Sequence, residues 1–340
     1  MSGTNISSAQ RAQNFAQATR KNYHMLPSQT VTQEGATVQF NYPKARLLSK
    51  TLIKFDFKFN DADLDILGYT EDGLVKDELV FYKLIRRISL SMNNGWEPFT
   101  ISGRDLALIN MCRINSSVIN SVNNNLVKID NVNGEASFVL ELENTLNQRD
   151  ASGLIILQNE ATQVTLTVDF ATNIHSENGF SCKVTPMITT FTIPNYPEAF
   201  PDISVVKLTK SRTESLLNAG EHIVKMDIGT IYRKIALYFT DENGEGCEPV
   251  KGNVELIYNT ADTPISIDID TLKFMNISQF GTNLPKGLYI FDFSGYEGFS
   301  NYGGSRDFID TSRLTEFWAR FTTTENCKCT IIQENLSRLR

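Results

Sequence analysis

Apolar and polar residues alternate over many short segments of this chain. Between residues 51 and 60, every second residue from Ile53 to Phe59 is apolar, and Lys54, Asp56 and Lys58 lie between them. Successive side chains of a strand point to opposite faces, so this spacing predicts a strand with one buried face. The same spacing predicts further strands within 81–92, 138–143, 164–170, 181–193, 224–228, 235–239, 254–258, 317–321 and 327–331.

Turns and a proline-rich stretch divide these strands into two groups. Asn93-Asn94-Gly95 and Asp241–Gly246 are typical of tight reversals between strands. Residues 194–201 contain three prolines. Because proline donates no ladder hydrogen bond, they predict an extended connector. The alternation restarts after it and predicts two β-sandwiches in tandem. The predicted segments are an N-terminal arm at 1–44, a first sandwich at 45–193 and a second at 194–340.

Few helices are expected between the strands. Ser102 is placed to cap a helix over 106–112, because serine accepts hydrogen bonds from the first free amides of a helix. Asp268 or Asp270 is placed to start a second short helix, which ends near Gly281. Each sandwich is therefore predicted to carry one inserted helix.

The N-terminal arm has a different pattern. Ser7 and Gln10 form a candidate capping box, and a helix is predicted from there to about His24, with Pro27 beyond its end. Its apolar stripe is weak, and such a helix is marginal without a surface to lie on. The arm is therefore expected to rest on another part of the protein or on a partner.

Charge sets this arm apart from the rest of the chain. Residues 1–33 contain no Asp or Glu, whereas the whole chain of 340 residues has a net charge of −7. This acidity argues against sequence-specific nucleic-acid binding, which depends on cationic contacts to phosphates. The candidate contact residues of the arm, for a surface or a neighbouring subunit, are Arg11, Phe15, Arg20, Lys21 and Tyr23.

The chain carries no recognisable catalytic motif. Walker A, G-x-G-x-x-G, H-E-x-x-H and G-x-S-x-G patterns are absent from the sequence. Its three histidines are scattered, and Asp61–Asp65 lacks the glycine and the final glutamate of a calcium loop. Cys327 and Cys329 share one strand face and are expected in the core. We expect no enzymatic activity, no cofactor and no metal site.

The five cysteines and the first residues bear on where the protein folds. An odd number of cysteines at scattered spacings is not a disulfide framework, and 1–10 lack the apolar core of a secretory signal. No apolar run reaches the roughly 20 residues of a membrane span. Synthesis and folding are therefore expected in a reducing host cytoplasm.

The order of these segments resembles a known viral family. The Gln- and Ala-rich stretch 9–21, the sequence 84–90 followed by Asn93-Asn94-Gly95 and Ser102-Gly103-Arg104, the stretch 190–197 and the stretch 284–289 occur in a similar order in tectivirus-type major capsid proteins. These belong to the double jelly-roll lineage of tailless icosahedral bacteriophages and the adenovirus hexon. The chain is compact by comparison, so short surface loops are expected.

The resemblance implies an all-β fold and a structural function. It implies two tandem eight-stranded jelly rolls with short inserted helices and an N-terminal helical arm. It further implies homotrimers that form pseudo-hexagonal capsomers of an icosahedral shell, with the arm on the inner face. The implied partners are other copies of the chain, neighbouring capsomers, vertex and minor capsid proteins and an internal viral membrane. The implied location is the virion.

Two other functions remain open from the sequence. A viral spike or carbohydrate-binding β-sandwich would gather aromatic side chains on one loop face. A β-sandwich hydrolase would bring two carboxylates together across a cleft. Glu141 and Glu143 are a candidate pair, but they lie on the polar face of a predicted strand, where we expect both to be solvated. Sandwich folds support all three functions, so the fold alone does not choose between them.

Overall fold

The computed structural model describes most of the chain and divides it into two compact units. The first unit comprises Met1–Ala107 and Ser121–Lys207 with the last three residues, and the second comprises Leu208–Ser337 with Leu108–Asn120. The predicted arm at 1–44 and the predicted sandwiches at 45–193 and 194–340 are not the same as these compact units, and their bounds stay predictions. The described residues are 8–60, 79–93, 95–113, 128–129, 133–145, 153–159, 161–172, 180–200, 204–259, 262–281, 283–293 and 309–338.

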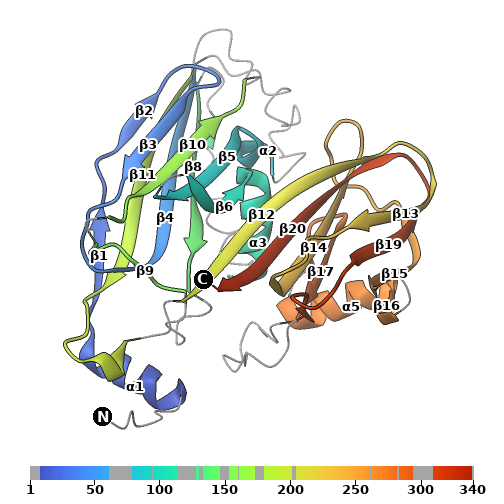
Figure 1. Ribbon diagram of the computed structural model, residues 1–340. Helices are drawn as coiled ribbons and strands as arrows, with labels where there is room; N and C mark the ends of the chain where they lie inside the picture. The colour runs from blue at the N-terminus through green and yellow to red at the C-terminus, as the bar shows by residue number, and fades with distance from the viewer. Residues whose placement is uncertain are drawn as a thin grey trace. The chain divides into compact units, whose positions relative to one another are not determined.

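The first unit contains two antiparallel sheets that face one another (Figure 1). One sheet has the strand order β1-β11-β4-β8-β7, with β2 also paired to β11 and β9 to β4, and the other has the order β6-β5-β10-β3. The strands are β1 Lys21–Met25, β2 Gln29–Val31, β3 Thr37–Asn41, β4 Leu47–Asn60, β5 Ile85–Met92, β6 Trp96–Ile101, β7 Lys128–Ile129, β8 Asn133–Glu143, β9 Ile155–Ile156, β10 Val164–Phe170 and β11 Phe180–Phe191.

Strand β4 shows how the sequence pattern produces the first core. The predicted inward residues from Ile53 to Phe59 are all buried, while Lys54 and Lys58 are exposed. Phe57 of β4 meets Phe170 of β10 edge to face, with ring centroids 6.1 Å apart. Because these strands belong to opposite sheets, this contact joins the two layers. The strand predicted at 51–60 is confirmed.

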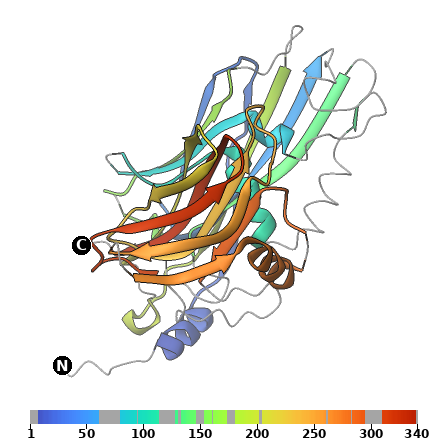
Figure 2. The same cartoon turned by 90° about the vertical axis from the view of Figure 1, so that its right-hand side faces the viewer.

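The second unit is also built from antiparallel strands, seen from two sides in Figures 1 and 2. One group has the order β17-β14-β20-β12, with β18 paired to β14, and a four-stranded sheet has the order β13-β19-β15-β16. The strands are β12 Val205–Leu216, β13 Gly220–Lys225, β14 Ile231–Thr240, β15 Val250–Tyr258, β16 Asp262–Asp268, β17 Leu288–Asp292, β18 Ile309–Asp310, β19 Phe317–Thr323 and β20 Cys327–Arg338.

Aromatic contacts fill the second core as well. Phe239 of β14 meets Phe321 of β19 with ring centroids 5.2 Å apart, so the two sheets pack face to face. Cys327 and Cys329 are both buried in this core, as predicted from their spacing. Two sandwiches in one mostly β chain agree with the predicted fold class.

The short helices carry the expected caps. Helix α3 spans Gly103–Arg113, and the Asp105 amide donates to Oγ of Ser102 at 3.1 Å. Helix α5 spans Ile269–Phe280. Its N-cap is Asp268, and it ends at Gly281, whose φ of 68° is the left-handed conformation that glycine adopts without strain. Figure 2 shows α5 alongside the strands of the second unit.

Two predictions about local structure need correction. The strand predicted at 81–92 begins only at Ile85, because Val80–Lys83 forms the helical turn α2. Phe81 and Tyr82 of this turn are both buried. The proline-rich connector likewise contains a 3-10 turn, η1, at Pro197–Ala199, between extended residues.

Candidate functional site

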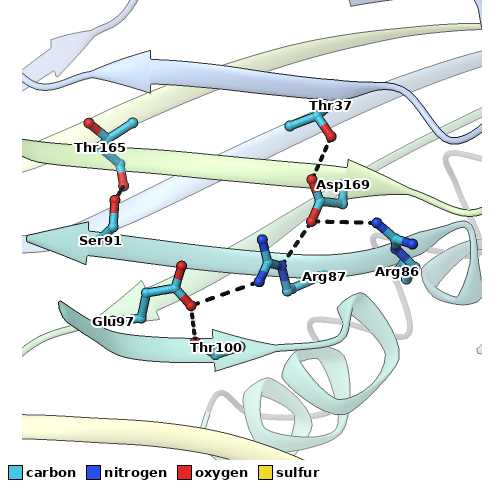
Figure 3. Close-up of polar contacts among 8 residues, drawn as sticks. All are labelled: Thr37, Arg86, Arg87, Ser91, Glu97, Thr100, Thr165 and Asp169. Atoms are coloured by element: carbon cyan, nitrogen blue, oxygen red, sulfur yellow. Dashed lines mark hydrogen bonds and ion pairs between the residues drawn. The ribbon is translucent and has the colours of Figure 1, made fainter. Parts of the chain in front are cut away.

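A row of polar side chains crosses the four strands β3, β10, β5 and β6 of the first unit (Figure 3). Asp169 of β10 lies in register with Thr37 of β3 and Arg87 of β5. Its carboxylate accepts hydrogen bonds from Thr37 Oγ1 at 2.6 Å and from Arg87 Nε at 2.8 Å. The Asp169 side chain is 6% exposed, and Arg86 adds a longer ion pair at 3.8 Å. The buried carboxylate of Asp169 thus interacts with the side chains of Thr37, Arg87 and Arg86.

The row continues onto β6. Nη1 of Arg87 lies 3.9 Å from Oε2 of Glu97, and Thr100 Oγ1 donates to the same oxygen at 2.9 Å. In Figure 3 the Arg87 guanidinium lies between the two carboxylates, so it joins β10 to β6 through β5. Charge-assisted hydrogen bonds of this kind are among the stronger polar contacts in proteins. The arrangement holds four strands in register and offers no free nucleophile or base.

Asp169→Ala is expected to lower the free energy of unfolding by about 2 kcal/mol, the usual range for a hydrogen bond to a charged group. The effect is moderate because the Arg87 side chain is 44% exposed and regains water. Arg86→Ala is the matched control. Its ion pair is long and its side chain 61% exposed, so about 0–1 kcal/mol is expected. Urea unfolding of the two variants tests this, and equal losses would contradict the assigned geometry.

The N-terminal arm contains a shorter helix than predicted. Helix α1 spans Ser8–Ala18, and the residues that follow form strand β1 instead of continuing to His24. Thr19 closes the helix by donating both its amide and its hydroxyl to the carbonyl of Phe15. Strand β1 then pairs with β11, and these tertiary hydrogen bonds replace a helix that has little stability of its own. Ser7 of the predicted capping box lies outside the described residues.

Phe15 lies where it anchors the arm. Its side chain is buried against Leu47 and Leu154, and its ring meets Phe191 at 5.2 Å. Phe15 therefore helps to fix helix α1 to the first unit. This places Phe15 inside the protein and leaves its ring unavailable to an outside partner in this conformation.

The other four candidate contact residues lie at the surface. Arg11 of α1 donates to the Phe200 carbonyl at 3.4 Å, and the Arg20 side chain donates to the Thr19 carbonyl at 3.0 Å. On β1, Lys21 Nζ lies 5.5 Å from the centre of the Tyr23 ring. The structure thus brings Lys21 and Tyr23 together on strand β1. Arg11 lies on helix α1, and Arg20 lies between the end of α1 and the start of β1.

Those residues weighed for metal or acid–base chemistry that the structure describes do not form a site. Within the described ranges, no group of three or more His, Cys, Asp and Glu residues is placed to hold a metal ion. His24 is exposed on β1, and His222 Nε2 lies 2.9 Å from the Asn218 carbonyl. His175 and the acidic stretch 61–65 lie outside the described residues.

The carboxylate pair weighed for hydrolysis is also accounted for. Glu141 forms an ion pair with Lys50 at 2.9 Å, while Glu143 is buried and lies 3.5 Å from Thr145 Oγ1. The expectation that both lie on a solvated face is wrong, because the Glu141 side chain is only 11% exposed and Glu143 is buried. A strand end covered by neighbouring residues cannot be recognised from alternation alone.

All five cysteines are buried and unpaired by disulfides. Burial raises the pKa of the Cys327 thiol to about 11 and raises that of Cys329 further. Because the thiolate is the reactive form, these side chains behave as small apolar core residues.

No helix within the described ranges is long and apolar enough to cross a membrane.

A small pocket lies in the second unit. Its volume is about 310 Å³, and it is lined by Leu208, Lys210, Asp227, Ile228, Thr230, Gln333 and Asn335. Among the described residues, its lining contains no aromatic ring of the kind that stacks on sugars. The pocket therefore gives no support to a carbohydrate-binding function.

Comparisons with solved structures identify the fold. The structure of the major capsid protein of Sulfolobus turreted icosahedral virus matches with a TM-score of 0.69 at 11% identity, over 94% of this chain and 97% of that chain. The capsid structure of the virus PBCV-1 matches with a TM-score of 0.68 at 11% identity, over 94% and 93%. Major capsid protein P2 of bacteriophage PM2 matches with a TM-score of 0.57 at 12% identity, over 94% and 98%.

These likenesses confirm the predicted double jelly-roll fold. They extend over nearly the whole of both chains, so the two sandwiches match as a pair rather than singly. The neighbours are not confined to bacteriophages, so the fold does not by itself select a tectivirus-type phage. No protein-family model and no curated protein matches the sequence.

Proposed function

We propose that this chain is the structural major capsid protein of a tailless icosahedral virus and has no enzymatic activity. The observation that carries the proposal is the match of two linked sandwiches, over 94% of the chain, to viral major capsid proteins. The described residues add a structural argument. The hydrogen-bonded Asp169 carboxylate and the buried cysteines stabilise a rigid scaffold and provide no reactive group.

The proposed assembly unit is a homotrimer. Two similar sandwiches per chain and three chains around one axis give six similar lobes, which tile a curved shell as pseudo-hexagons. Such a trimer closes by rotation, so each copy uses two different surfaces. Stable contacts of this kind usually bury about 2,000–5,000 Å². Vertex and minor capsid proteins would complete the shell of the virion.

Native mass spectrometry of the purified protein tests this proposal. A native mass of three times 38.2 kDa, with pseudo-hexagonal particles in negative stain, is the expected result. A stable monomer at the concentrations used for assembly would overturn it. The spike or carbohydrate-binding alternative would instead predict binding on a glycan array without shell formation.

The surface positions of the arm suggest its orientation in such a shell. Arg11, Arg20 and Lys21 are exposed in a stretch without acidic residues, and Phe15 anchors that stretch to the first unit. We infer that the arm faces the inside of the shell, where its charges meet the anionic headgroups of an internal membrane. Each charge contributes about 1 kcal/mol near such a surface, and many copies act together.

Neutralising these charges is expected to weaken membrane binding. The variant Arg11→Gln/Arg20→Gln/Lys21→Gln should bind vesicles containing phosphatidylserine about 100-fold more weakly per chain, since about 3 kcal/mol is lost. The control Lys210→Gln/Lys251→Gln/Lys328→Gln removes the same charge from exposed lysines of the second unit. Cosedimentation with anionic and neutral vesicles provides the measurement. Equal binding by both variants would contradict the inward orientation.

A further inference from the structure

Strand β1 forms an edge of the larger sheet in the first unit. It pairs with β11 from Lys21↔Phe191 to Met25↔Met187, and it stands last in the strand order. Tyr23 and Met25 are 62% and 64% exposed. Figure 1 shows β1 running along β11 at the side of the sandwich. Exposed edges with apolar side chains are ready to pair with another strand.

The hydrogen bonds to β11 show which backbone groups point outward. The Leu26 amide donates to the Pro186 carbonyl, and the Thr192 amide donates to the Arg20 carbonyl. In an antiparallel pair, alternate residues bond to the partner. The even-numbered residues of β1 therefore face β11, and Lys21, Tyr23 and Met25 direct their N–H and C=O groups away from it. Within the described part of the chain, these groups have no backbone partner.

Two other edge strands of the protein are protected. Edge strand β16 contains Pro264, which donates no hydrogen bond. At edge strand β17, the Asn276 side chain of α5 bonds both the carbonyl and the amide of Ile290. Strand β1 contains no proline, and no such side chain covers it among the described residues. The edge of β1 is therefore open, whereas the edges of β16 and β17 are protected.

We propose that β1 pairs antiparallel with β1 of a second copy of this chain. In the register that uses the whole strand, Tyr23 faces Tyr23 and Lys21 faces Met25. All three outward residues then meet outward residues of the partner, which gives a continuous sheet across two copies. The side chains agree with this register, because each Lys21 lies opposite an apolar residue.

Other registers fit the strand less well. A shift that centres the pair on Lys21 places two like charges opposite one another, which is destabilising. A shift that centres it on Met25 brings Tyr23 opposite Pro27, which has no amide to donate. A parallel arrangement sets Lys21 beside Lys21. The sequence of β1 thus favours a two-fold pair centred on Tyr23.

This inference deepens the proposed function and rests on it, because a shell brings neighbouring copies of the chain next to one another. A two-fold contact uses the same surface on both partners, whereas closure of a trimer uses two different surfaces. The β1 pair is therefore a contact between capsomers and not the contact within one. The two can be tested separately.

Disulfide trapping tests the pair and its register. In the proposed pair the Tyr23 Cα atoms are about 5.5 Å apart, which suits a disulfide. Tyr23→Cys should therefore give a covalent dimer in more than half of the chains under mild oxidation. Lys21→Cys alone should not, because its two copies lie about 13 Å apart along the strands. The double variant Lys21→Cys/Met25→Cys should again give dimers. The five native cysteines are buried and do not compete.

The outcomes separate this inference from the proposed function. Cross-linking is measured on concentrated protein and on assembled particles. Equal cross-linking of the two single variants, or none with Tyr23→Cys in either preparation, would overturn the β1 pair. Loss of trimers with a retained Tyr23→Cys dimer would overturn only the proposed trimer.

A backbone variant gives independent evidence. Tyr23→Pro removes one outward amide and leaves the β11-facing bonds in place, so it should reduce the association of capsomers at least tenfold relative to Tyr23→Ala. Equal association of these two variants would also overturn the pair.

Discussion

Asp292→Ala is expected to lower the free energy of unfolding by about 3–5 kcal/mol, because it removes one partner of a buried ion pair. Lys234 Nζ lies 3.2 Å from Asp292 Oδ2, and the two side chains are 11% and 0% exposed. The residues face one another on β14 and β17. Gln279 of α5 also donates to Asp292 Oδ2 at 3.2 Å. The carboxylate therefore holds a helix and two strands together.

Tryptophan fluorescence provides the measurement. Trp318 lies on β19 of the second unit and Trp96 on β6 of the first. A Trp96→Phe background therefore reports on the second unit alone during urea unfolding. The control is Glu248→Ala, which breaks the partly exposed ion pair with Lys273 of the same unit and should change the transition little. A loss for Asp292→Ala as small as that of the control would contradict a stabilising role for this ion pair.

This buried ion pair illustrates what alternation in the sequence leaves out. The pattern around Ile235 predicts one apolar face of β14 and correctly identifies the core residues. It also suggests that Lys234 and Tyr238 face solvent, yet both are buried. Alternation indicates that one face is covered and carries no information about a second layer on the other face. Lys234 is tolerated there because Asp292 lies directly opposite.

The polar row around Asp169 escaped prediction for a related reason. The sequence places Asp169 at a polar position of a strand, between apolar neighbours. Its partners Thr37 and Arg87 are 132 and 82 residues away in the chain, so no local pattern relates them. Strand order and register determine this contact, and neither can be read from local patterns in a single sequence.

The candidate assembly surface was predicted only in part. The absence of acidic residues from the arm indicates where exposed basic residues occur, and Arg11, Arg20 and Lys21 are at the surface. Strand β1 could not be foreseen, because its edge is created by pairing with β11. The exposed alternate residues Tyr23 and Met25 are the one local signal of that strand. They become informative only when the free edge is known.

Phe57→Ala is expected to destabilise the first unit by about 3–5 kcal/mol, the usual range for removing a buried aromatic ring. The Phe57 side chain is almost fully buried in β4. Its ring centroid lies 5.8 Å from that of Phe59, 5.9 Å from that of Phe138 and 6.1 Å from that of Phe170. The first two neighbours belong to the same sheet and the third to the opposite sheet. Truncation therefore leaves a cavity between the layers that rigid sheets cannot close.

Val139→Ala is the matched control for this core. Val139 lies on the neighbouring strand β8 but points to the outer face and is 47% exposed. Its truncation should change stability by less than about 0.5 kcal/mol, as is usual for surface positions. In a Trp318→Phe background, Trp96 reports the unfolding of the first unit. If the Phe57→Ala loss is confined to that unit, the two sandwiches have separate cores, and a shell subunit would tolerate damage to one without loss of the other. A matching loss reported by Trp318, in the Trp96→Phe background, would instead show that the two sandwiches unfold cooperatively.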